Sequence, residues 1–165
     1  MFSRTSVPIN DNFVGKKWNN IIVAPITGKE SELADATVNY KLAPVSNVEI
    51  VPYEIIKSMI VKRGLEEQLE LDSVGIYSQL SSEFSADGFI IGIVDTRRAV
   101  ALLGTRAQVA TVVLNIYHTT DHRLASSVRK TASSCFLDKE SLIVEASEDA
   151  SDNVIAVSNQ IVGGQ

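Results

Sequence analysis

The sequence predicts an α/β fold in which helices pack on a mixed sheet of about five strands. Two observations support this fold class. In the first half of the chain, short apolar runs bounded by proline, glycine or aspartate alternate with helical patterns, and strands separated by helices can run parallel. In the second half, consecutive strands with short connections should run antiparallel, and a long amphipathic C-terminal helix follows the last hairpin.

The first expected elements are two strands that enclose a helix. Residues 21–24 form a compact apolar run that ends at Pro25, which suits a buried strand. Residues 31–42 have a loose helical period, and Pro44 would stop a helix there. Residues 47–51 form the second short strand. These elements precede the main helical part of the chain.

Successive helices are expected after the second strand. Pro52 suits a first helical turn, because the N–H that proline lacks is not needed there, and Gly64 is the expected end of that helix. Residues 65–71 are acidic and amphipathic and should continue as a turn or helix. Asp72 can cap a further helix that runs through Ala86.

The strongest strand signals lie in the second half. Residues 89–94 form a continuous apolar run that suits a strand buried on both faces, and residues 109–118 form a longer strand. The turn at 119–122 leads to an outer strand at 123–132. The clearest helix is 138–162. Its apolar residues recur at steps of three or four: Ile143, Ala146, Ala150, Val154, Val157 and Ile161.

Length and composition set the domain organisation. A chain of 165 residues with 45% hydrophobic residues is long enough for one α/β domain, predicted over residues 17–165. Residues 1–16 are polar and rich in turn formers, so we expect a flexible N-terminal tail. No run approaches the roughly 20 apolar residues of a membrane-spanning helix.

Charge and cysteine content exclude several classes of function. The net charge of -5 leaves no global basic field for a phosphate backbone, so no nucleic acid is expected as a partner. A single cysteine, Cys135, permits neither an intramolecular disulfide nor a zinc cluster built from thiolates. The spacing favours a Cys135 side chain that fills the core.

Catalytic motifs are weak throughout. His118, Asp121 and His122 surround one turn and could approach a divalent ion, although histidines across a hairpin turn need not converge. No G-x-S-x-G elbow occurs, and Gly28-Lys29 is followed by glutamate where a phosphate loop requires serine or threonine. The sequence therefore predicts no enzyme and no cofactor.

The segment from Arg97 to Arg106 is the candidate interaction site. It joins two strands, is apolar at its centre and carries arginines on both sides, so the candidate interface residues are Arg97, Arg98, Leu102, Leu103 and Arg106. One interpretation is a strand extension whose apolar residues pack on the domain's own helices. The other is a contact surface for a neighbouring subunit, with the acidic side of the C-terminal helix as its complement.

Four segments give the chain a family resemblance. They are IIVAP at 21–25, VEIVPYEII at 48–56, FSADGFIIGIV at 84–94 and VVLNIYHTTDHRLASSVRK at 112–130. In this order they resemble the CsgG and TolB-N-terminal-like group of bacterial envelope proteins. The group's usual Thr-Gly turn is replaced here by Thr120-Asp121. The connection at 96–107 is too short for two membrane-crossing strands of about 9–11 residues each.

The resemblance implies a non-enzymatic subunit of a secretion, export or flagellar complex, often an oligomeric ring that works with other envelope proteins. It also implies a periplasmic, outer-membrane-associated lipoprotein. Because no lipidated cysteine stands near Met1, membrane association would run through an N-terminal anchor that has been removed. Two alternatives remain: a small-ligand or metal-binding enzyme that uses the His118, Asp121 and His122 turn, and a cytosolic adaptor domain.

Overall fold

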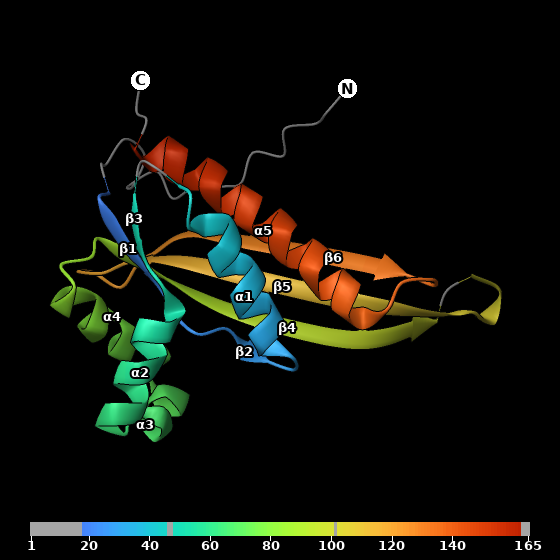
Figure 1. Cartoon of the computed structure of the whole chain (residues 1–165), viewed down its shortest axis with the longest axis horizontal. Helices are drawn as coiled ribbons and strands as arrows, with labels where there is room; N and C mark the ends of the chain where they lie inside the picture. Colours follow the sequence, from blue (N-terminus) through green and yellow to red (C-terminus); the bar gives the residue numbers. More distant parts are fainter. Residues whose placement is uncertain (1–17, 46–47, 101, 163–165) are drawn as a thin grey trace.

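The computed structural model describes residues 18–45, 48–100 and 102–162, without the side chains of Leu102 and residues 159–162. The predicted tail at 1–16 lies outside the described residues. Figure 1 shows the mixed α/β arrangement that the sequence predicts, with helices packed on a twisted sheet. None of the helices in the described ranges combines the length and apolar character that crossing a membrane requires.

The elements follow the expected order. The strands are β1 (Asn20–Val23), β2 (Thr27–Gly28), β3 (Glu49–Val51), β4 (Gly88–Val100), β5 (Arg106–His118) and β6 (Leu124–Ser134). The α-helices are α1 (Ser31–Leu42), α2 (Tyr53–Arg63), α3 (Glu66–Leu71), α4 (Ser73–Glu83) and α5 (Lys139–Val162), and a short 3-10 turn, η2, spans Leu102–Gly104.

One mixed sheet joins all the strands in the order β3-β1-β4-β5-β6, with β2 beside β4. β1 runs parallel to both β3 and β4, because a helical connection separates it from each of them. β4, β5 and β6 are consecutive and antiparallel, as the sequence predicts. The β4–β5 pairing is continuous over the full length of both strands, from Gly88 opposite His118 to Val100 opposite Arg106.

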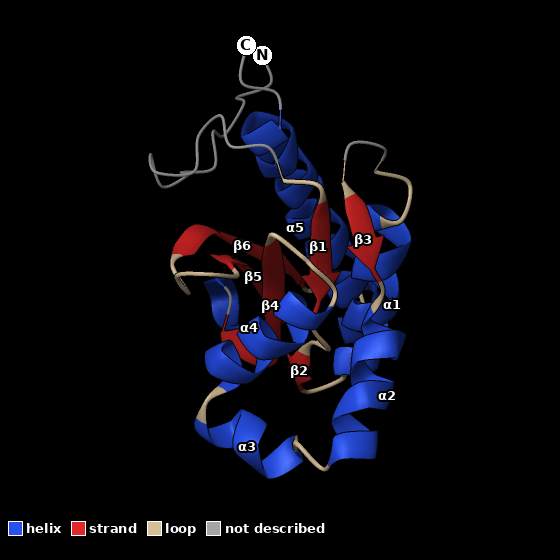
Figure 2. Ribbon diagram, turned by 90° about the vertical axis from the view of Figure 1, so that its left-hand side faces the viewer, coloured by secondary structure: helices blue, strands red, loops and turns tan. Residues whose placement is uncertain are grey.

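Helices cover the two faces of this sheet unequally. α1 and α5 lie across one face, where the periodic apolar residues of α5 meet the buried residues of β5 and β6. α2, α3 and α4 gather on the opposite face, as Figure 2 shows from the side, and form a second core around Ile22, Ile56, Leu80 and Phe89. This second layer covers only one end of β4 and β5, so the other end of that face is open.

Local signals explain three of the helix ends. Gly64 adopts a left-handed conformation and donates its N–H to the last carbonyls of α2, as expected of a C-terminal glycine. Asp72 accepts a hydrogen bond from the Gly75 N–H at 3.0 Å and caps α4, and Asp138 does the same for Ser141 at the start of α5.

Two details of the structure differ from the sequence prediction. The helix expected to run through Ala86 ends at Glu83, because Ser85 adopts a left-handed conformation and turns the chain toward the sheet. The sequence also did not predict the short strand β2, which pairs with β4 at Ile93 and Val94. Neither change alters the fold class.

Asp35 of α1 is a buried carboxyl group that fixes the chain after β1. Its Oδ1 accepts a hydrogen bond from the Ile26 N–H at 2.6 Å. Burial raises the pKa of Asp35 to about 6, although the hydrogen bond from Ile26 and the charge of Lys57 act in the opposite direction. The folded protein therefore binds this proton more tightly than the unfolded chain does.

This pKa difference predicts a measurable pH dependence. The stabilisation from protonated Asp35 is complete below the unfolded pKa of 3.8 and is lost as the pH rises through about 6. At about 1.4 kcal/mol for each pH unit between the two values, the change is roughly 3 kcal/mol. Asp35→Asn retains an oxygen for Ile26 but cannot titrate. Urea unfolding should show that the wild type loses about this much unfolding free energy between pH 4 and pH 7.5, relative to Asp35→Asn. If the difference in unfolding free energy between the two proteins does not change with pH, the pKa of Asp35 is not raised by folding.

Candidate functional site

The connection between β4 and β5 forms an arm that projects past the helices. We define the arm as residues 97–100 and 102–106. Figure 1 shows this part of the hairpin beyond the ends of α1 and α5, on the side of the molecule away from α3. The two strands reach this far because their pairing continues without interruption to Val100 and Arg106. The arm is therefore a strand extension, as one of the two interpretations expected.

Two large apolar side chains of the arm do not pack on the domain. Val100 is 82% exposed and Leu103 is 99% exposed, so the expectation that such residues pack on the protein's own helices is wrong for these two. The side chain of Leu102 lies outside the described residues. Leu103 also adopts a left-handed backbone conformation, with φ 65° and ψ 25°. Glycine, asparagine or aspartate suits that conformation better than leucine does.

The arginines of the arm are available to a partner. Arg97, Arg98 and Arg106 are exposed, and none of them takes part in a salt bridge among the described residues. They line an open cleft of about 680 Å³ between the arm and the β6–α5 connection. The two neighbouring acidic side chains in that cleft are Asp138 and Glu140.

The β6–α5 connection adds exposed groups beside the arm. Phe136 is 98% exposed and lines the same cleft, and Leu137 is partly exposed. The Cys135 thiol is exposed, so the expectation that it fills the core is wrong. Lys139 pairs with Glu30, and this hydrogen bond raises the pKa of Lys139. The arm end of the molecule is thus both apolar and basic.

A second surface of interest is a groove between the helical layer and the open face of the sheet. Its volume is about 410 Å³. Leu69 of α3, Tyr77 of α4, and Ile91 and Ile93 of β4 supply apolar walls, and Glu66 and Glu70 of α3 supply carboxylates. Ile93 remains 49% exposed at the point where the helical cover ends. The groove is therefore mainly apolar with acidic groups beside it.

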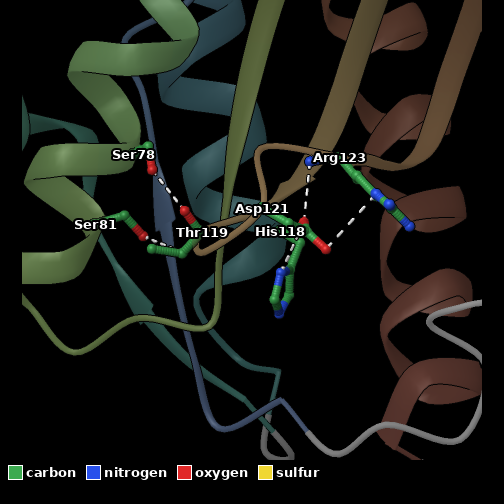
Figure 3. Close-up of polar contacts among 6 residues, drawn as sticks. All are labelled: Ser78, Ser81, His118, Thr119, Asp121 and Arg123. Atoms are coloured by element: carbon green, nitrogen blue, oxygen red, sulfur yellow. Dashed lines mark hydrogen bonds and ion pairs between the residues drawn. The ribbon is translucent and has the colours of Figure 1, made fainter.

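The turn proposed as a metal site has a different geometry. His118 Nδ1 and Asp121 Oδ1 are 3.0 Å apart, and Asp121 also accepts the Arg123 N–H at 3.1 Å, as Figure 3 shows. Partial desolvation alone would raise the pKa of Asp121, but these hydrogen bonds outweigh it and lower the pKa. Within the described ranges, no three His, Cys, Asp or Glu side chains are grouped so that they could hold a metal ion.

Buried hydroxyl groups attach this turn to α4. The Ser78 hydroxyl donates to the Thr119 carbonyl oxygen at 2.6 Å, and the Ser81 and Thr119 hydroxyl oxygens are 2.7 Å apart (Figure 3). The His118 ring also lies 5.9 Å from the Trp18 ring, measured between centroids. These contacts give the turn a structural role, because they connect the β5–β6 hairpin to the helical layer.

Sequence reasoning found the arm but missed the groove. The groove combines residues from α3, α4 and β4 that are far apart in sequence, so no local pattern identifies it. One partial signal was the pair Ile91 and Ile93, which are two residues apart and therefore lie on the same face of β4. Nothing in the sequence indicated that the helices would leave part of that face uncovered.

Comparisons with known proteins identify the fold. No family model matches the sequence, and no curated protein matches it. The PelC dodecamer from Paraburkholderia phytofirmans has a TM-score of 0.53 at 12% identity, over 91% of this chain and 93% of that chain. The lipoprotein GNA1162 from Neisseria meningitidis has a TM-score of 0.54 at 13% identity, over 84% and 98%.

A third structure extends this likeness. The hypothetical protein CT253 from Chlamydia trachomatis has a TM-score of 0.55 at 6% identity, over 88% of this chain and 98% of that chain. The chain therefore has a fold that also occurs in a bacterial lipoprotein and in PelC. The narrower resemblance to the CsgG and TolB group stays a prediction.

Proposed function

We propose that this chain is a non-enzymatic structural subunit of a bacterial cell-envelope assembly, of the secretion, export or flagellar kind, and that it works in an oligomeric ring. The arm is the observation on which we base the proposal. It presents a fully exposed leucine in a left-handed conformation beside exposed arginines. Such a surface favours a protein partner that buries the leucine and pairs with the arginines.

The shared fold supports the envelope part of this proposal by analogy. One structure with this fold is a dodecamer of PelC, and another is the Neisseria lipoprotein. We infer that the chain acts in the periplasm at the outer membrane, with a lipid anchor attached upstream of the described domain. Copies of itself and other envelope proteins would be its partners.

Self-association tests the role of the arm. Sedimentation velocity of the wild type should show a species larger than the 17.9 kDa chain. Leu103→Asp should weaken this assembly at least about tenfold, because a charge then enters a contact that leucine would fill. The monomer should stay folded, since aspartate suits the left-handed conformation of residue 103.

Tyr40→Asp is the matched control, because Tyr40 is also an exposed large side chain but lies on α1. It should leave the assembly unchanged. A wild type that stays monomeric at every concentration, or an assembly insensitive to Leu103→Asp, would contradict the proposed function. Recovery of the full-length protein from the cytoplasm alone would contradict its envelope part.

A further inference from the structure

We propose that the arm of one copy docks in the groove of the next copy. This inference rests on the proposed function and identifies the surface that receives the arm. The groove is the one described above, with Leu69, Tyr77, Ile91 and Ile93 as its walls and Glu66 and Glu70 beside them. The ligand of the groove is thus the hairpin end of a second copy of this chain.

The two surfaces match in their apolar character. Val100 and Leu103 extend from the arm with most of their surface in water, and Ile93 is half exposed within the groove. Each surface alone exposes large apolar side chains, which is costly in an isolated soluble domain. One contact between them would remove both from water.

Their charges are also complementary. The arm carries arginines at positions 97, 98 and 106 and no acidic residue. α3, which forms one side of the groove, carries glutamates at positions 66, 67 and 70 and no basic residue. Opposite charges on facing surfaces orient the approach of two copies and fix the register of the contact.

The arm cannot reach the groove of its own chain. Ile93 lines the groove, whereas Val100 stands at the end of the same continuous strand, β4. The intervening residues extend this strand by roughly 23 Å, at about 3.3 Å per residue. The two surfaces can therefore meet only between copies. Because the contact joins different surfaces, its repetition gives a closed ring or an open filament.

The acidic side of α5, expected from the sequence to receive the arm, fits less well. Its exposed acidic residues are Glu145, Glu148, Asp149 and Asp152. In the described part of α5, however, no large apolar side chain is exposed beside them, and Lys41 already pairs with Asp152. This face could satisfy the arginines but would leave Val100 and Leu103 in water.

Charge reversal distinguishes these surfaces. Arg97→Glu on the arm and Glu70→Arg in the groove should each weaken self-association at least about tenfold, measured by sedimentation, and added salt should weaken the wild-type contact. The double variant Arg97→Glu with Glu70→Arg should recover at least part of the loss. Glu148→Arg on α5 is the matched control and should have no effect. Circular dichroism would verify that every variant is folded.

Mixing two defective proteins tests the head-to-tail geometry. Leu103→Asp has a damaged arm and an intact groove, whereas Glu70→Arg has the reverse. Each protein alone should be mainly monomeric. Their mixture should form a one-to-one dimer, because one intact arm can still enter one intact groove. A mixture that stays monomeric would overturn the arm-to-groove contact.

Other outcomes separate this inference from the proposed function. If Leu103→Asp disrupts the assembly but Glu70→Arg does not, the proposed ring subunit stands and the groove is the wrong receptor; a loss with Glu148→Arg would then identify α5. If the wild type is monomeric and instead binds phosphatidylglycerol vesicles through Leu103, the arm contacts a lipid surface. That result would overturn both the proposed function and the arm-to-groove contact.

Discussion

Replacing Phe89 with alanine is expected to lower the free energy of unfolding by about 3–5 kcal/mol. Phe89 is fully buried in the core between the sheet and α2–α4. Its ring stacks on Tyr117 with centroids 5.3 Å apart and an interplanar angle of 14°. The substitution would remove this contact and leave a cavity beneath α4, so chemical denaturation should show a large loss of stability.

Phe136→Ala provides a matched control for this experiment. It removes the same atoms from a side chain that is 98% exposed, so it should change the unfolding free energy by about 0.5 kcal/mol or less. If Phe89→Ala costs no more than Phe136→Ala, the helical layer does not pack on β4 as described. The groove depends on the same layer, because α3 and α4 form its walls.

Gly28→Ala should have the second large effect, with a loss of about 3 kcal/mol or more. Gly28 has a φ of 114°, and a Cβ atom there would lie 1.9 Å from the Val94 carbonyl oxygen. Alanine would therefore have two costs: a strained backbone conformation, and a collision of its Cβ with backbone atoms of β4 that cannot rotate away. We expect β2 to separate from β4, which hydrogen exchange at the Thr27 and Gly28 amides would detect.

Gly64→Ala isolates the backbone contribution to this effect. Gly64 also has a positive φ, 62°, but no atom lies within 4 Å of its expected Cβ position. Alanine at position 64 should cost about 1 kcal/mol from conformation alone. Equal losses in the two variants would show that the close approach of Gly28 to β4 is not maintained in solution.

Sequence patterns predicted the secondary structure well where the signals are local. The step of three or four along α5 identified Ile143, Ala146, Ala150 and Val154, all of which are buried against the sheet. Likewise, Gly64 and the cap at Asp72 act at helix ends as predicted, because each needs only its immediate neighbours. The mixed sheet followed from the order of these elements.

The arm is an example of a feature whose solvent exposure such patterns do not predict. The apolar centre of residues 97–106 was visible in the sequence, and so were its arginines. Whether Val100 and Leu103 would be covered depended on how far α1 and α5 extend along the sheet, which is a property of the packed structure. Cys135 was misassigned for the same reason, since a small apolar residue gives no signal of its distance from the core.

Periodicity and neighbours in the chain specify most of the strands and helices and the apolar face of each, so these features could be predicted from the sequence. Which of the apolar faces are covered depends on how the elements pack against one another. The groove exists because α3 and α4 pack over one end of β4 and leave Ile93 half exposed. The arm exists because the pairing of β4 with β5 continues beyond the ends of the helices. Burial is a relation between elements distant in the chain, so no local pattern specifies it.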